Sequence, residues 1–189
     1  QKVKNNLIKE QQKKIEIGIV IKQGTLENPA KSIYLGVGSN LGDKKQNIEL
    51  TKFKLIENNI KILQSSNYYE SLSWPNPQQP KFLNIVLRVL SNLSSLDLLN
   101  KCKEIEVSLG RKTTAKNSPR VCDIDIIDYK HQQLRGDLIL PHPRMHQRNF
   151  VLLPLYELNK NWVHPKSKLH IKKLIFSLSN LDFRSIKQI

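Results

Sequence analysis

The chain contains the stretch Arg120-Val121-Cys122-Asp123-Ile124-Asp125-Ile126-Ile127-Asp128, in which apolar and acidic side chains alternate. Such alternation over a short run is typical of a β-strand with one buried and one polar face. In a strand, Cys122, Ile124 and Ile126 would point to one side, and Asp123 and Asp125 to the other. We therefore predict a strand that packs on a core and presents two carboxylates about 7 Å apart at their Cα atoms.

The sequence before this strand alternates strand-like and helix-like segments. Apolar spacing predicts strands at 33–37, 60–72 and 82–90, and helices at 44–59 and 94–109. The order β-α-β-β-α-β is that of a ferredoxin-like α+β sandwich, an antiparallel or mixed sheet with helices packed on it. After the strand we expect a short helix over 147–158, interrupted at Pro154, and a terminal helix over 168–179.

The 189 residues are enough for one domain of about 150 residues with flanking segments. We predict a folded domain over 32–165 and a basic C-terminal helical tail packed on it over 166–189. Residues 1–31 form either a basic N-terminal extension or the remnant of a preceding segment. Within them, the apolar run at 15–21 could add an edge strand to the sheet.

Lys and Arg number 31 against 16 acidic residues, which gives a formal charge of +15. Residues 1–31 carry +4 and residues 160–189 carry +6, so the segment between them carries only +5. Such an excess suggests an anionic partner: nucleic acid, a membrane or a phosphorylated small molecule. Compositional drift toward lysine explains the flanks equally well.

Cysteine content and hydropathy indicate the compartment. Cys102 and Cys122 are too few for a disulfide framework and lack CxxC spacing, so we expect buried thiols in a reducing environment. The sequence shows neither an apolar run of about 18 residues nor a secretory signal. We therefore expect a cytoplasmic protein without a membrane partner.

The carboxylate pair Asp123 and Asp125 has two explanations. One is a solvated polar face, because the outer side of a strand is often charged. The other is a site for a hard cation such as magnesium, which prefers carboxylate oxygens. Aspartate is uncommon in strands, like charges on one face repel, and a basic loop at 111–119 comes just before. A combined metal and anion site accounts for both signs of charge.

Phosphate binding would need side chains rather than a glycine loop. The turn GVGSNLG at 36–42 fits neither GxGxxG nor GxxxxGK[ST], and favours a tight strand-to-helix connection. The candidate side chains are Arg111, Lys112, Lys116, Arg120, His142, Arg144, His146 and Arg148. For each of them alone, a solvated surface position is favoured over a contact with a ligand. A zinc site at His142 and His146 is not favoured, since Pro143 lies between them and no carboxylate accompanies them.

Several short motifs in one order resemble the 6-hydroxymethyl-7,8-dihydropterin pyrophosphokinase family. They are GVGSNLGD at 36–43, a proline-rich loop followed by FLN at 82–84, GR at 110–111, PR at 119–120 running into DIDI at 123–126, and PHPRM at 141–145 leading to RNF at 148–150. The resemblance covers about 33–165. It implies that the domain transfers diphosphate from ATP to a pterin alcohol and releases AMP, as a step of folate biosynthesis without a covalent enzyme intermediate.

The resemblance also implies roles for individual residues. Asp123 and Asp125 would hold two magnesium ions between ATP and the pterin. The pterin would be bound by Ser71, Leu72, Trp74, Phe82, Asn84 and Phe150, with the two phenylalanine rings stacking on it. ATP would be bound by Glu106, Arg111, Arg120, Ile126, His142 and Arg148. Arg111 and Arg120 would be catalytic. Core packing is the alternative for either phenylalanine.

Some positions depart from the family pattern. Asn117 and Ser118 stand where the family often has Trp-Gly, and Asp137 and Ile139 stand where basic and hydroxyl side chains can help to hold ATP. A catalytically weakened family member is therefore one alternative. A basic nucleic-acid-binding module is another, but it leaves DIDI, FLN and RNF unexplained. We expect a monomer that binds ATP and the dihydropterin, with a neighbouring folate-pathway domain left open.

Overall fold

The structure is a computed structural model that describes residues 32–111 and 117–189. The edge strand expected at 15–21 and the middle of the basic loop, with Lys112 and Lys116, lie outside the described residues. The elements in chain order are β1 (Ile33–Ser39), α2 (Lys44–Glu57), β2 (Lys61–Ser65), β3 (Tyr69–Ser71), β4 (Phe82–Leu90), α3 (Ser95–Ser108), β5 (Asp123–Tyr129), the 3-10 helix η2 (Met145–Gln147), α4 (Asn149–Leu158), α5 (Ile171–Phe176), α6 (Asn180–Arg184) and β6 (Ile186–Gln188). No helix among these residues is long and apolar enough to cross a membrane.

The strands form one antiparallel sheet in the order β5-β1-β4-β3-β6, with β2 also paired to β4. The four strands and two helices predicted between residues 33 and 128 occur in the predicted order. This order confirms the ferredoxin-like α+β fold. One row of paired residues crosses the sheet: Gly38 on β1 lies opposite Asn84 on β4 and opposite Asp123 on β5. The register therefore brings an amide and a carboxylate to the same end of the sheet.

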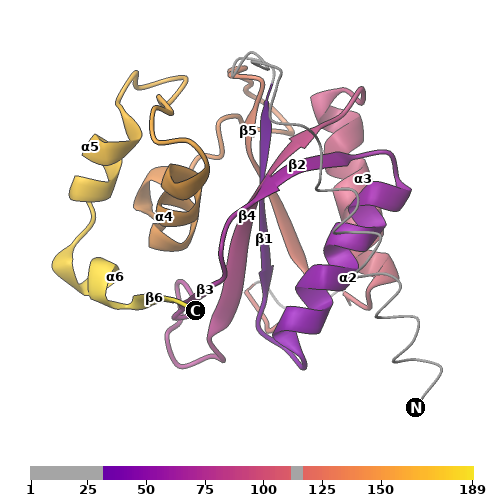
Figure 1. Ribbon diagram of the computed structural model, residues 1–189, viewed down its shortest axis with the longest axis horizontal. Helices are drawn as coiled ribbons and strands as arrows, with labels where there is room; N and C mark the ends of the chain where they lie inside the picture. Colours follow the sequence, from indigo (N-terminus) through magenta and orange to yellow (C-terminus); the bar gives the residue numbers. More distant parts are fainter. Residues whose placement is uncertain (1–31, 112–116) are drawn as a thin grey trace.

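Helices α2 and α3 cover one face of the sheet (Figure 1). Each begins at a capping side chain: Asp43 accepts a hydrogen bond from the amide of Gln46, and Ser94 from that of Asp97. Beneath them, the apolar face of β5 is buried in the main core. Cys102 and Cys122 are both buried there as free thiols, as expected from the sequence.

Helices α4 and α5 cover the opposite face and enclose a second core (Figure 1). The predicted interruption at Pro154 is wrong, since α4 continues through this residue. A proline inside a helix removes one backbone hydrogen bond and usually costs about 3 kcal/mol. Val151, Leu152 and Leu155 are buried against the sheet, and this packing offsets the cost.

Two further expectations need correction. The strand predicted over 60–72 is divided into β2 and β3, and between them the hydroxyl of Ser66 accepts a hydrogen bond from the amide of Val86 on β4. The terminal helix predicted over 168–179 is limited to α5. It is followed by α6 and by β6, which pairs with β3 as an edge strand. The C-terminal tail thus includes a strand of the sheet rather than helix alone.

Candidate active site

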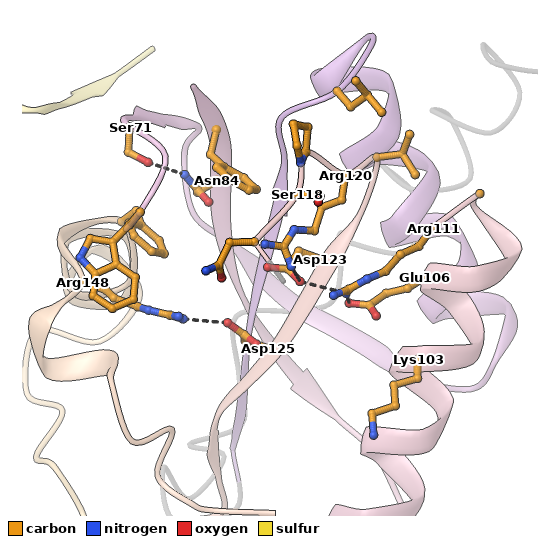
Figure 2. Close-up of a pocket in the computed structure, with 18 of the residues that line it drawn as sticks. Ser71, Asn84, Lys103, Glu106, Arg111, Ser118, Arg120, Asp123, Asp125 and Arg148 are labelled. Atoms are coloured by element: carbon orange, nitrogen blue, oxygen red, sulfur yellow. Dashed lines mark hydrogen bonds and ion pairs between the residues drawn. The ribbon is translucent and has the colours of Figure 1, made fainter. Parts of the chain in front are cut away.

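A cavity of about 800 Å³ opens at the end of the sheet where β1 ends and β4 and β5 begin. Eleven of the fourteen predicted site residues line it (Figure 2). They are Ser71, Trp74, Phe82, Asn84, Glu106, Arg111, Arg120, Asp123, Asp125, Arg148 and Phe150. These residues are far apart in the sequence. Five of them (Glu106, Arg111, Arg120, Asp123 and Asp125) form what we call the charged wall, and another five (Ser71, Trp74, Phe82, Asn84 and Phe150) the aromatic wall.

The two carboxylates of the charged wall stand on the polar face of β5. Asp123 and Asp125 line the cavity, whereas Cys122, Ile124 and Ile126 are buried in the core on the other side of the strand. This division of the strand confirms the expectation from the alternating sequence. It also places two acidic side chains side by side in a partly enclosed site.

Each carboxylate is paired with arginine. The Oδ1 atom of Asp123 lies 2.9 Å from Arg111 and 3.2 Å from Arg120, and the Oδ2 atom of Asp125 lies 2.9 Å from Arg148. Burial and the neighbouring charge of Asp125 raise the pKa of Asp123 in spite of its arginine partners. Binding of a further cation near the carboxylates would therefore be favourable.

Glu106 ties the charged wall to helix α3. Its Oε1 atom accepts a hydrogen bond of 2.6 Å from the backbone amide of Ile124 and lies 2.5 Å from a guanidinium nitrogen of Arg111. The side chain is buried, and burial raises its pKa to about 7. Glu106 thus holds Arg111 against Asp123 and fixes the start of β5 relative to α3.

The aromatic wall is built from uncharged groups. Asn84 Nδ2 donates a hydrogen bond of 2.9 Å to the hydroxyl of Ser71, and both side chains are buried. Gly38 lies between Asn84 and Asp123, and a Cβ atom there would approach Asn84 Oδ1 to 2.9 Å and Phe82 to 3.3 Å. The missing side chain at this position therefore leaves room for the amide and the ring.

Arg148 connects the two walls. Besides its contact with Asp125, its guanidinium carbon lies 5.4 Å from the ring centre of Trp74 and 5.5 Å from that of Phe150. Arg120 similarly lies 5.8 Å from the ring of Phe82. Cationic groups over aromatic rings at these distances are attracted by the ring faces. The arrangement brings the aromatic rings directly beside a cluster of charges.

Residues 34–160 match the family model described as 7,8-dihydro-6-hydroxymethylpterin-pyrophosphokinase (HPPK). The match spans more than half of the chain and includes every residue of both walls. The chain belongs to the HPPK family.

Two relatives illustrate how HPPK sequences are arranged. The 2-amino-4-hydroxy-6-hydroxymethyldihydropteridine pyrophosphokinase of Aquifex aeolicus is 38% identical over 143 residues, 75% of this chain and 89% of that protein. The folic acid synthesis protein FOL1 of Dictyostelium discoideum is 42% identical over 149 residues, 78% of this chain and 22% of that protein. The chain therefore spans only about a fifth of the FOL1 protein.

A solved structure of an HPPK-DHPS protein in complex with substrates has the same fold. It aligns with a TM-score of 0.65 and 14% identity over 83% of this chain and 46% of that chain. The likeness at this identity concerns the fold and supports the ferredoxin-like assignment.

Three residues assigned through the HPPK resemblance do not line the cavity. Leu72 is partly exposed beside the aromatic wall, and the side chain of Ile126 is in the core. A contact of Ile126 with ATP would therefore involve its backbone. His142 lies behind the charged wall, with Nε2 3.8 Å from Asp125 and 3.4 Å from Arg148. Burial lowers the pKa of His142 to about 4, so it is neutral near pH 7.

Lys103 is a lining residue that the sequence reasoning missed. It precedes Glu106 by three residues on α3, and this spacing places both side chains on the same face of the helix. The assignment of Glu106 was thus a signal that Lys103 also faces the cavity. Arg144, considered earlier only as a phosphate candidate, lies 5.2 Å from the ring of Trp74 and also lines the cavity.

Proposed function

We propose that this chain transfers diphosphate from ATP to 6-hydroxymethyl-7,8-dihydropterin. The observation that carries the proposal is the direct adjacency of the two walls in one cavity: the rings and amide of the aromatic wall, which we call the pterin slot, lie beside paired carboxylates and arginines. In the reaction, the pterin hydroxyl oxygen forms a bond to the β-phosphorus of ATP. The bond from that phosphorus to the oxygen bridging to the α-phosphate breaks, AMP leaves, and the hydroxyl proton is released.

The charged wall has the donor set for magnesium. No cluster of three or more His, Cys, Asp or Glu residues that could hold a metal occurs within 32–111 and 117–189. Two carboxylates suit magnesium nonetheless, because this ion is usually bound by one or two carboxylates together with substrate phosphates and water. Asp123 and Asp125 would hold it, and when bound it would neutralise charge on the phosphates.

The arginines fit a phosphate role. Arg120 and Arg148 each have a buried Nε atom without a hydrogen-bond partner in the described part of the chain. A buried donor without a partner is costly, and a phosphate oxygen would satisfy it. We infer that ATP and its cation replace the ion pairs seen here: the carboxylates turn to the cation, and Arg111, Arg120 and Arg148 turn to the phosphates.

The aromatic wall would bind and orient the pterin. Phe82 and Phe150 supply ring faces for stacking, and Asn84 supplies both a donor and an acceptor to the polar edge. Asn84 is fixed by its hydrogen bond to Ser71, so little reorganisation accompanies binding. Asn84 and Asp123 both lie opposite Gly38, so a pterin held by Asn84 would lie close to the carboxylates. Catalysis would then rest on positioning and on charge stabilisation.

Two residues that line the cavity depart from the family pattern, and we propose that they affect how tightly the site closes over its substrates. Asn117 and Ser118 line the cavity, so the departure from Trp-Gly removes an aromatic surface at this place. We expect a functional enzyme with weaker closure over the substrates. The related proteins give no support to the nucleic-acid-binding alternative.

Incubation of the purified chain with ATP, magnesium and 6-hydroxymethyl-7,8-dihydropterin tests the proposal. The expected product is AMP, formed only when all three are present. Release of ADP, or release of AMP independent of the dihydropterin, would contradict it.

The bifunctional protein FolKE of Lactococcus lactis and FOL1 are longer than this chain, so a neighbouring folate-pathway unit is part of the proposal. The size of the native protein tests that part and the expected monomeric state, and cell fractionation tests the expected cytoplasmic location.

A further inference from the structure

The C-terminal segment 179–189, which we call the strap, contains α6 and β6 and follows the part of the chain that matches the HPPK family model. No residue of α6 is buried. The strap therefore adds little to either core. Figure 1 shows it passing from α5 to the edge of the sheet beside β3.

One attachment of the strap is a strand ladder. Ile186 pairs with Ser71 and Gln188 pairs with Tyr69, and the amide of Ile189 donates a hydrogen bond of 3.0 Å to the carbonyl of Tyr68. Ser71 is the residue whose hydroxyl accepts the hydrogen bond from Asn84. The strap thus covers the outer edge of the strand that supports the aromatic wall.

The other attachment is the side chain of Asn149. Its Nδ2 atom donates hydrogen bonds to the backbone carbonyl of Asp182 and, at 3.0 Å, to the hydroxyl of Ser185. Asn149 is buried, with 6% of its surface exposed, and it is the first residue of α4. Its neighbours in the sequence are Arg148 and Phe150, which both line the cavity.

A second link between α4 and β3 lies at the far end of the helix. Glu157 accepts a hydrogen bond of 2.9 Å from the hydroxyl of Tyr69 and others from Asn67. Glu157 follows Asn149 by eight positions in the helix, which corresponds to a rise of about 12 Å along the helix axis. Glu157 fixes the end of α4 remote from the cavity, and the strap fixes the end that carries Phe150.

We propose that the strap sets the width of the pterin slot, with Asn149 as the positioning residue. The inference rests on the proposed function, because the slot is the one assigned to the dihydropterin. The strap joins β3, which supports Asn84 through Ser71, to the start of α4, which carries Phe150. Loss of this join would loosen one ring relative to the amide, but it would leave the carboxylates on β5 in place.

The variant Asn149→Asp tests the join. A carboxylate cannot donate a hydrogen bond to the carbonyl of Asp182, whereas an acidic residue in the first turn suits the start of α4. We expect the dihydropterin Kd to rise roughly tenfold, the change that corresponds to the loss of about one hydrogen bond. The ATP Kd should rise less, because Arg148 is the only proposed ATP-binding side chain at the start of α4. Leu181→Ala is the matched control, because this strap side chain is 81% exposed and should leave both constants unchanged.

A cross-link separates the two attachments. Glu70 on β3 lies opposite Lys187 on β6, and paired residues of antiparallel strands have Cα atoms about 4.5–5.5 Å apart, which a disulfide can span. In the Asn149→Asp background, oxidised Glu70→Cys with Lys187→Cys should leave the dihydropterin Kd raised, because the disulfide ties the strap to β3 and not to α4. Full recovery of dihydropterin binding would contradict the role of Asn149. Should Asn149→Asp fail to fold, Ser185→Ala provides the same test, because it removes one of the two acceptors of Asn149. The expected rise in the dihydropterin Kd is then smaller.

The outcomes separate the two proposals. An unchanged dihydropterin Kd in a folded Asn149→Asp protein would overturn the role of the strap, as would an equal loss of ATP and dihydropterin affinity. A wild-type chain that binds no dihydropterin and releases no AMP would instead overturn the proposed function.

Discussion

The charged wall and the aromatic wall face the same cavity but are held together in different ways. In the charged wall, Asp123 and Asp125 are paired with arginines that we propose for the substrate phosphates. In the aromatic wall, Asn84 is fixed by Ser71 and has room beside Gly38, and neither interaction involves charge. In the proposed function, the carboxylates exchange their partners when substrates bind, whereas the amide of Asn84 is already held in place.

This difference predicts a division of effects. Changes in the charged wall should act on turnover, because in the proposed function the charge that develops on the transferring phosphate would be stabilised there. Changes in the aromatic wall should act on dihydropterin binding, because its groups would contact the substrate equally before and during the reaction.

The largest effect is expected for Asp123→Asn and Asp125→Asn. Each removes one of the two negative charges that would hold the cation, so diphosphate transfer should fall by on the order of 10³-fold or more. The measurement is the rate of AMP formation at saturating substrates. Glu104→Gln, on the exposed surface of α3, is the control and should retain the wild-type rate. Substantial turnover in either aspartate variant would refute the metal assignment.

The next effect is expected for Asn84→Ala. The variant loses the amide that we propose for recognition of the pterin edge, and it leaves the hydroxyl of Ser71 without the hydrogen bond from Asn84. The KM for the dihydropterin should rise by roughly 10- to 100-fold, with a much smaller change in kcat. A parallel rise in the KM for ATP would show that the two walls are not separable.

A smaller effect is expected for Gly38→Ala, whose Cβ atom would press on Asn84 and Phe82. We expect a dihydropterin KM about tenfold higher, with a stability loss of about 1–2 kcal/mol. Gly36→Ala on the same strand is the matched control. The nearest atoms to its Cβ would be in the Ile127 side chain, at 3.2 Å, and the backbone oxygen of Asp125 would lie at 4.0 Å. Thermal unfolding should show a loss of stability in both variants, whereas only Gly38→Ala should raise the KM for the dihydropterin. An equal kinetic defect in the two would contradict a specific role for Gly38.

The smallest effect is expected for Glu106→Gln. The amide oxygen can still accept the hydrogen bond from Ile124, but the charge that holds Arg111 is lost. The KM for ATP should rise by about two- to fivefold, and the KM for the dihydropterin should stay the same. Steady-state kinetics with each substrate varied in turn distinguishes this result from a general loss of activity.

The sequence predicted the charged wall better than the aromatic wall. Alternation in β5 determines which side chains share a face, so Asp123 and Asp125 could be placed from local pattern alone. Asn84 and Ser71 meet only through the pairing of β3 with β4, and no local pattern encodes that register. Their assignment came from the family resemblance and not from periodicity.

The parts of the fold that were missed depend on tertiary contacts. The strand β6 has only three residues and no periodic pattern, and its pairing with β3 defines it. Helix α4 continues through Pro154 because its apolar residues are buried against the sheet. Histidine is a residue type that can bind phosphate, but in the structure His142 lies behind Asp125 and Arg148. The residue type alone could not have predicted this position.

In the proposed function, Asp123 and Asp125 serve diphosphate transfer and not pterin recognition. The most direct test of this assignment is calorimetric titration of the Asp125→Asn protein with 6-hydroxymethyl-7,8-dihydropterin, in parallel with a rapid-quench measurement of AMP formation by the same preparation. We predict a dihydropterin Kd equal to that of the wild type and AMP formation lowered by on the order of 10³-fold. Loss of dihydropterin binding together with turnover, or turnover at the wild-type rate, would contradict the assignment.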